Sequence, residues 1–450
     1  MINSQNKVNL REIALHLFKG VFQTIDAEIA VYNSVRIEKS TLYICNESFE
    51  LSDFPEIYAI ALGKAAMSMA FGLNQLLSEK ITAGIASAPK SENKLPAKWQ
   101  VFAGGHPIPN QESLAAAQAS IELLKKANHP NALVIYLISG GGSAMLELPK
   151  DESISLKDLQ KTNQILVNCG ASINEINKLR RIISKIKGGG LSRIAPFARQ
   201  VSLIISDTNK GDLASVASGP TIQLFNSDNS RWKAIEIVEK YQIKDLLPKT
   251  IFNFFDEVET HNFQTSEDYI KHSIYSLLDN SNAVESLEES AKKLGFITEI
   301  VDDLVETEIA EGCRELIKRL LSLKEKNSGK DVAIISGGEF VCPVRGNGVG
   351  GRNLETTLRC LLEIEKQTVE KFDFAILSGG TDGIDGNSPV AGAIADQTSL
   401  KRAKNLGLNP NRFLENSDSY NFFQALGDVI ETGATGTNVR DVRILLAKAV

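Results

Sequence analysis

Five short apolar runs, each followed at once by glycines or polar residues, constrain the fold of this chain most strongly. They cover residues 57–62, 132–138, 201–205, 332–335 and 374–377. Each run is continuously apolar, as parallel strands are when helices cover both faces of their sheet. Helical patterns lie between the runs or before them, at residues 10–32, 65–77, 111–127, 156–168, 283–294 and 309–326. This alternation predicts an α/β protein with mainly parallel sheets flanked by helices.

The length of the chain predicts more than one domain. A protein of 450 residues exceeds what one ordinary hydrophobic core holds. The segment 226–266 is polar and contains no glycine-rich strand end, so we expect the boundary there. The sequence therefore predicts a first α/β domain at residues 1–245, a linker at 246–269 and a second α/β domain at 270–450.

Composition argues against several classes of protein. The net charge of −6, without a basic run, argues against a nucleic-acid binder. No apolar run approaches the ~20 residues that a membrane-spanning helix needs, and the first residues are too polar for a signal peptide. The five cysteines form no CxxC pair and the five histidines no HExxH motif, which fits a reduced, zinc-free protein. We therefore expect a cytoplasmic protein.

The segment 377–396 begins with glycines packed around two acids, directly after the last apolar run. Asp382 and Asp385 stand at the carboxyl end of a predicted strand, where open α/β sheets bind ligands. The glycines let a ligand approach the backbone, and carboxylates suit a hard cation such as Mg2+. Two consecutive Asp-Gly turns with exposed acids explain the same residues equally well. The combination suggests phosphate chemistry and makes these two acids candidate metal ligands.

Two earlier strand ends carry groups that suit an anion. Lys64 stands between a predicted strand and a helix N-terminus, although an exposed lysine would give the same pattern. The second apolar run ends in a loop whose successive amides can form an anion-binding nest, and a flexible connection is the alternative. Its members are Ser139, Gly140, Gly141, Gly142 and Ser143.

Lys187 precedes three further glycines and is another candidate for phosphate binding. It follows a basic helical stretch whose Arg180, Arg181 and Lys185 are also explained as a solvated face. Asp207 and Asp212 flank the loop after the third apolar run, where acids can bind a metal or a hydroxyl. Their signal is weak because Asp also favours turns.

The segment 346–351 matches GxGxxG and precedes a predicted helix that begins at Arg352. A dinucleotide fold also needs an acid about 20 residues further on, at the end of the next strand. Asp373 lies near that distance but at the start of its strand, so the match favours phosphate binding in general. Arg352 adds a bidentate donor suited to phosphate or carboxylate.

Together, these motifs resemble the type II glycerate 2-kinase family, whose C-terminal half is the MOFRL domain. The resembling segments follow one another over nearly the whole chain: GKAA at 63–66, GGHPIPN at 104–110, SGGGSAM at 139–145, SKIKGGGL at 184–191, SDTNKGD at 206–212, ASGPT at 217–221, SGGE at 336–339, GVGGRNLE at 348–355, GGTDGIDG at 379–386, AGAIAD at 391–396 and TGATGTNV at 432–439. Chance matches of short motifs would not keep this order.

The resemblance implies ATP-dependent phosphorylation of D-glycerate at its 2-hydroxyl, giving 2-phosphoglycerate and ADP, with Mg2+ as cofactor. It implies an active site in a cleft between two α/β domains, no nucleic-acid or membrane partner, and is compatible with a homodimer. Lys64 and Arg352 would neutralise charge, while Asp207, Asp382 and Asp385 would hold Mg2+ or orient the hydroxyl. The substrate and phosphate contacts would come from Ser139, Gly140, Gly141, Gly142, Ser143, Lys187, Glu339, Gly350, Gly351 and Asn438.

The chain departs from the family pattern at three positions. Ile182 stands where His is common, Val390 where Asp is common, and Ala434 where Pro is common. These departures motivate one alternative, a catalytically silent sensor of sugar acids or nucleotides. The GxGxxG match motivates another, an NAD(P)H-dependent hydroxypyruvate reductase.

Overall fold

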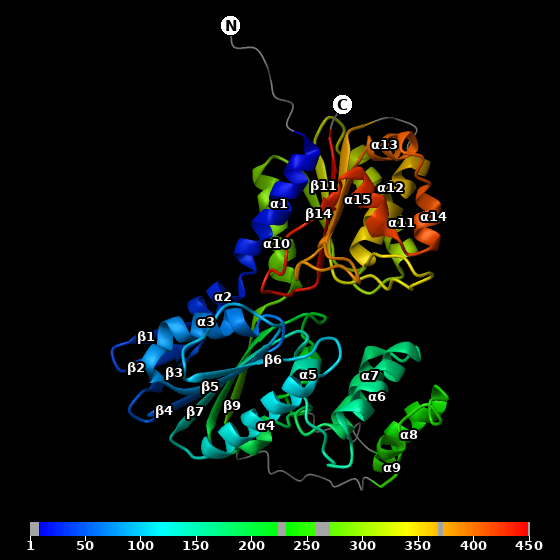
Figure 1. The fold of residues 1–450 in the computed structure, drawn as a ribbon. Helices are drawn as coiled ribbons and strands as arrows, with labels where there is room; N and C mark the ends of the chain where they lie inside the picture. Colours follow the sequence, from blue (N-terminus) through cyan, green and yellow to red (C-terminus); the bar gives the residue numbers. More distant parts are fainter. Residues whose placement is uncertain (1–8, 224–230, 258–270, 368–371, 449–450) are drawn as a thin grey trace. The chain divides into compact units, whose positions relative to one another are not determined.

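The computed structural model describes residues 9–223, 231–257, 271–367 and 372–448. The chain folds into two compact units (Figure 1). Residues Ala27–Leu277 form one, called here the insert unit, and Met1–Asp26 together with Leu278–Val450 form the other, the terminal unit. Among the described residues, no helix has both the length and the apolar character needed to cross a bilayer.

The insert unit is built on a six-stranded sheet. Its spatial order is β6-β5-β4-β7-β8-β9, and the neighbours from β6 through to β8 pair in parallel. Every residue of β7 is buried, which confirms that the apolar runs are strands covered on both faces. The strands are β4 (Glu56–Leu62), β5 (Ile81–Ala88), β6 (Trp99–Ala103), β7 (Ala132–Ser139), β8 (Arg199–Ile205) and β9 (His272–Leu278).

Helices cover this sheet, and polar caps define where several of them begin. Capping boxes at Asn110, Ser155 and Ser172 start α4, α6 and α7, because their side chains satisfy amides that the helix leaves open. A small antiparallel sheet precedes β4, formed by β1 (Val35–Glu38), β2 (Thr41–Ile44) and β3 (Glu47–Glu50). The helices are α2 (Ala27–Ser34), α3 (Ala66–Leu77), α4 (Gln111–Lys126), α5 (Gly142–Met145), α6 (Leu156–Asn168), α7 (Ile173–Ile183), α8 (Arg231–Lys240) and α9 (Lys249–Glu257).

The terminal unit contains a mixed six-stranded sheet in the order β10-β11-β15-β12-β13-β14. β10 and β11 are parallel, but β15 lies antiparallel between β11 and β12. The α/β class is therefore confirmed, and the mainly parallel arrangement describes the insert unit better than this one. The strands are β10 (Ile297–Val301), β11 (Val332–Gly337), β12 (Phe374–Gly380), β13 (Gly392–Asp396), β14 (Val429–Ile430) and β15 (Asp441–Ala447).

Helices lie on both faces of the mixed sheet. α1 and α10 cover one face, and α11 and α12 cover the other (Figure 1). The second pair encloses a core that includes Leu316, Leu358 and Ile376. The helices are α1 (Leu10–Thr24), α10 (Asn280–Lys293), α11 (Ile309–Lys326), α12 (Arg352–Gln367), α13 (Ser399–Asn405), α14 (Pro410–Glu415) and α15 (Ser419–Leu426).

The units differ from the expected division at 1–245, 246–269 and 270–450. The expected helix at 10–32 is two helices, and α1 belongs to the terminal unit because its buried stripe, which includes Phe18, packs on β12, β15 and α10. β9 completes the sheet of the insert unit instead of opening the next domain. In the expected linker, residues 246–248 lead into α9, and residues 258–269 lie outside the described part of the chain.

Candidate active site

Lys64 lies in the turn between β4 and α3, against the loop that follows β7. Its amide donates to the carbonyl of Gly140 at 2.8 Å, and the amide of Ala65 donates to Oγ of Ser139 at 3.0 Å. Gly63 makes this approach possible, since its φ is +111° and a Cβ there would lie 2.4 Å from the carbonyl oxygen of Ser139. Neighbouring parallel strands thus bring Lys64 and the loop together at their carboxyl ends.

The SGGGS loop, residues 139–143, presents amides to its surroundings. Those of Gly141, Gly142 and Ser143 donate to no acceptor within the described part of the chain. Gly141 has a φ of +80°, and a Cβ there would lie 3.2 Å from Cγ of Lys64. Successive amides beside a lysine suit an anion such as a phosphate or carboxylate.

Lys187 occupies a different environment from the one expected of a phosphate ligand. It is fully buried and forms an ion pair with Glu147, which also accepts from Oγ of Ser184 at 2.6 Å. Burial lowers the pKa of Lys187, and the attraction of Glu147 opposes that shift. The two charges balance each other inside the protein. The ion pair between Lys187 and Glu147 therefore stabilises the turn before Gly188.

Asp207 begins the loop that follows β8, the neighbour of β7 in the sheet. The loop is closed by Thr208, whose hydroxyl donates to the carbonyl of Asp212 at 2.7 Å. Asp207 is partly exposed. It therefore lies at the same edge of the parallel sheet as the SGGGS loop.

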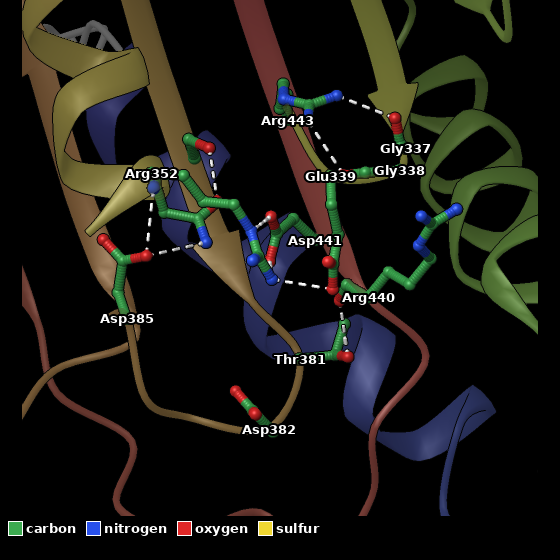
Figure 2. A network of polar contacts seen from close by, with 12 residues as sticks. Gly337, Gly338, Glu339, Arg352, Thr381, Asp382, Asp385, Arg440, Asp441 and Arg443 are labelled. Carbon is green, nitrogen blue, oxygen red and sulfur yellow. Dashed lines mark hydrogen bonds and ion pairs between the residues drawn. The ribbon is translucent and has the colours of Figure 1, made fainter. Parts of the chain in front are cut away.

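In the terminal unit, Arg352 begins α12 and is held by two carboxylates (Figure 2). Its Nε lies 2.5 Å from Oδ2 of Asp441, and its Nη2 lies 2.7 Å from Oε1 of Glu339. Burial is the largest influence on the pKa of Arg352 and lowers it, but the attraction of both carboxylates outweighs burial and raises the pKa overall. The Asp441 side chain is 4% exposed and that of Glu339 is 32% exposed. Arg352 therefore has one fixed partner and one at the surface.

Asp385 supports the start of the helix that carries Arg352. Its Oδ1 accepts from the amide of Asn353 at 3.0 Å and its Oδ2 from that of Leu354 at 2.8 Å. Burial raises the pKa of Asp385 to about 7, although these two hydrogen bonds oppose the shift. Gly351 must be glycine, because a Cβ there would lie 2.4 Å from Cγ of Asp385.

Asp382 lies at the tip of the loop after β12, away from the helix start that Asp385 caps (Figure 2). Its Oδ1 accepts from the amide of Ile384 at 3.2 Å. No group of three or more His, Cys, Asp or Glu side chains within the described ranges is arranged to hold a metal ion. The two acids of the expected metal pair therefore have different surroundings.

Four amides of the GNGVGG segment donate to other parts of the protein. Those of residues 347–350 donate to acceptors on Asn416, Asp418 and Asn387. The amides of Asn353 and Leu354, in the first turn of α12, donate to Asp385. A dinucleotide fold leaves the amides of its glycine-rich loop for the pyrophosphate, whereas the amides of residues 347–350 in this GxGxxG match bond to the protein itself.

Buried polar residues that sequence reasoning missed hold the loop of Glu339. Arg443 is fully buried in β15 and donates to the carbonyls of Gly337 at 2.7 Å and Gly338 at 2.8 Å (Figure 2). Its guanidinium lies 3.6 Å from the ring centroid of Phe340. An arginine inside an otherwise apolar run was the available signal.

Asn438, one of the expected phosphate contacts, lies before β15. It is buried, and its Oδ1 accepts from the amide of Arg440 at 3.2 Å.

Comparison with known proteins identifies the family. Residues 13–256 match the model described as a domain of unknown function (DUF4147), and residues 332–441 match the MOFRL family. The D-glycerate 2-kinase of Thermotoga maritima is 32% identical over 440 residues, which is 97% of this chain and 98% of that relative. The chain belongs to the glycerate 2-kinase family.

Two further similarities bear on function. A crystal structure of glycerate kinase from Thermotoga maritima superposes with a TM-score of 0.80 at 29% identity, covering 97% of this chain and 99% of that one. A relative from Agrobacterium vitis named putative hydroxypyruvate reductase is 30% identical over 98% of this chain and 95% of the relative. The second name matches the reductase alternative.

The departures from the glycerate 2-kinase pattern have structural explanations at two positions. Ile182 is 3% exposed and packs in an apolar cluster with Leu179 and Phe255. Val390 is 1% exposed and belongs to the core beneath α12. Both side chains fill apolar space, whereas Ala434 is exposed in the loop between β14 and β15.

Proposed function

We propose that this protein transfers the γ-phosphoryl group of ATP to the 2-hydroxyl of D-glycerate. The oxygen of that hydroxyl forms a bond to the γ-phosphorus, the bond to the bridging oxygen breaks, and ADP leaves. Membership of the glycerate 2-kinase family supports this reaction. The observation that carries the proposal is the SGGGS loop, whose amides remain available beside Lys64.

The residues suit phosphoryl transfer, which depends mainly on positioning and on neutralising charge. Lys64 would bind an anionic group of a substrate next to the amides of the SGGGS loop. Arg352 would bind a second anionic group, with Asp441 fixing the orientation of its guanidinium. Asp207 is our candidate for accepting the proton of the attacking hydroxyl, because it is a partly exposed carboxylate at that edge of the sheet.

The donor set fits a Mg2+ ion that enters with the nucleotide. Mg2+ typically keeps several waters and is bound by one or two carboxylates together with phosphate oxygens. Asp382, at a loop tip, would supply a carboxylate, whereas both oxygens of Asp385 already accept from α12. When bound, the ion would neutralise phosphate charge.

A coupled assay of ADP release tests the reaction. The panel comprises D-glycerate, L-glycerate and related hydroxy acids, and 31P NMR of the product shows which hydroxyl is phosphorylated. We expect turnover with D-glycerate, a 2-phosphate product, and a large loss of kcat in Lys64→Ala with little change in melting temperature. Wild-type turnover in Lys64→Ala would exclude Lys64 from the site.

The two alternatives predict different results in the same experiments. Hydroxypyruvate reduction requires NADH or NADPH to bind, and the occupied amides of residues 347–350 argue against it. A sensor would bind ATP and glycerate without releasing ADP.

We place the protein in the cytosol, where ATP is abundant, since all five cysteines are free.

A further inference from the structure

The turn that contains Ser218 has a backbone shape that proteins rarely use. Ala217, Ser218 and Gly219 follow one another with φ values of +50°, +62° and +64°. Two of these residues carry side chains, for which this left-handed region is unfavourable. Such strain persists only where surrounding contacts hold it, and it concentrates at functional sites.

Arg181, near the end of α7, holds this turn. Its Nε donates to the carbonyl of Ser218 at 3.3 Å and its Nη2 to the carbonyl of Ala214 at 2.9 Å. The amide of Gly188 donates to the same Ser218 carbonyl at 3.1 Å. Arg181 therefore does not lie on a solvated basic face but fastens the strained turn at two points.

The turn carries the Ser218 hydroxyl into a short chain of hydrogen bonds. Its Oγ donates to Oδ1 of Asn177 at 2.9 Å, and it lies 3.0 Å from Oγ of Ser143 in the SGGGS loop. Ser218 and Asn177 are 1% and 3% exposed, whereas Ser143 is partly exposed. The chain thus leads from a buried amide to the hydroxyl at the loop.

The direction of these hydrogen bonds determines what Ser143 can offer a ligand. A hydroxyl has one proton to donate. Ser218 gives its proton to Asn177, so Ser143 must donate in its bond with Ser218. The Ser143 oxygen then has only lone pairs left and can act toward a ligand only as an acceptor. An ionised phosphate or carboxylate has no hydrogen to donate to it, but a hydroxyl group does.

We propose that Ser143 recognises a hydroxyl group of the acid substrate by accepting its hydrogen bond, and that Ser218, Asn177 and Arg181 are positioning residues that fix this polarity. The proposal rests on the proposed function and narrows the role of the SGGGS loop. Its amides would bind the charged group of the substrate, and its last side chain would distinguish a hydroxy acid from the same acid without that hydroxyl.

Binding of three acids tests the proposal without requiring turnover. Calorimetric titrations measure the binding of three acids to wild type and to Ser143→Ala. D-glycerate has both hydroxyls, D-lactate lacks the 3-hydroxyl, and 3-hydroxypropionate lacks the 2-hydroxyl. In wild type, we expect loss of the recognised hydroxyl to weaken binding about tenfold, as for one hydrogen bond. Ser143→Ala should bind D-glycerate no more tightly than it binds the acid that lacks the recognised hydroxyl. Equal weakening for all three acids, or no change, would overturn the proposal.

Substitutions along the chain test the polarity. Asn177→Asp can only accept, so it should keep the wild-type preference for glycerate, while Asn177→Leu and Ser218→Ala should reduce it. Arg181→Lys reaches one carbonyl at a time and should also reduce the preference. Loss of the preference in Asn177→Asp as well as in Asn177→Leu would overturn the assigned direction.

A matched control separates positioning from simple destabilisation. Ser120, in α4, has a buried hydroxyl that donates to the carbonyl of Ala116 at 2.8 Å, and Ser120→Ala should leave the ratio of affinities unchanged. If Ser218 had a purely structural role, Ser218→Ala would lower the melting temperature of the protein without altering the ratio of its affinities for D-glycerate and the deoxy acid. That result would contradict the proposal. If wild type releases no ADP with D-glycerate, the proposed function fails, while the binding panel still decides whether Ser143 selects a hydroxyl.

Discussion

At the scale of single residues, Arg352 shows how two carboxylates hold one guanidinium in place. Asp441 accepts from Nε and, at 3.4 Å, from Nη2 of that guanidinium, and Glu339 contacts Nη2 as well. The buried partner fixes orientation, and the exposed partner occupies the side from which an anion would approach. A ligand that binds Arg352 must therefore displace Glu339 or bind beside it.

Replacing Arg352 with lysine tests whether this fork geometry matters. A lysine keeps the charge but cannot contact both carboxylates as the planar fork does. We expect Arg352→Lys to lower kcat/KM by about 100-fold, the scale of a misplaced positioning group. Arg359→Lys, on the same helix and paired with Glu355, is the control and should keep its rate. Full activity in Arg352→Lys would mean that any cation suffices.

Asp385 should make stability depend on pH. Its pKa in the folded protein, about 7, is above the ordinary value of about 4. The protonated acid therefore favours the folded state at low pH, and this contribution is lost as pH rises from about 4 through 7, by about 1.4 kcal/mol per unit. Asp385→Asn cannot ionise and should lack this loss. Urea unfolding at pH 5 and pH 8 measures the difference, and parallel changes in both proteins would refute the shifted pKa.

Sequence alone singled out several candidate site residues but not the partners that the structure gives them. Lys64 and Arg352 were recognisable because each stands at a predicted strand–helix or loop–helix junction. Asp382 and Asp385 look alike in sequence, since both precede glycine. Their burial and partners differ because α12 begins over only one of them, and such a contact depends on how distant segments pack.

At the scale of elements, the strands that sequence predicted are those with uninterrupted apolar residues. β5 was missed because alanine and glycine dilute its apolar pattern, and β15 because Asp441 and Arg443 interrupt it. Both charged residues serve polar contacts at one end of the sheet. The rule that a strand core excludes charge fails here because both side chains have polar partners.

Two glycine substitutions should have opposite effects on α1 and the strand beneath it. A Cβ on Gly379 in β12 would lie 2.6 Å from Cζ of Phe18, whereas Gly20 in α1 has nothing within 4 Å. We expect Gly379→Ala to lower the free energy of unfolding by about 1–3 kcal/mol through overpacking. Gly20→Ala should raise it by roughly 0.5–1 kcal/mol through helix propensity. Urea titration measures the free energy of unfolding of both variants. A more stable Gly379→Ala would show that α1 does not pack tightly against β12.

At the scale of the whole molecule, each unit has its own sheet and its own core. The apolar stripe of α1 predicted a helix with one buried face. It did not predict on which of the two sheets that face packs. Sequence proximity favoured the insert unit, and the packing of Phe18 on β12 favours the terminal unit. The boundary therefore could not be read from composition along the chain.

Hydrogen exchange should report the two units separately. Phe18→Ala removes a buried ring from α1 and should speed exchange in β12 and β15 while leaving β4 and β7 unchanged. Leu73→Ala, in α3 of the insert unit, should do the reverse, because α3 packs on β4 and β7. Mass spectrometry of peptic peptides resolves these strands. Faster exchange in all four strands of either variant would mean that the units unfold together.

The insertion of one unit between α1 and its partner strands has a consequence during translation. Arg11 and Asp396, which form an ion pair, are 385 residues apart in sequence. At about 5–20 residues per second, a ribosome needs roughly 20–80 s to cover that distance. The insert unit completes its last strand well before then, whereas α1 leaves the exit tunnel with an apolar stripe that nothing yet covers. The nascent chain therefore carries a ready binding site for chaperones at its leading end for most of its synthesis.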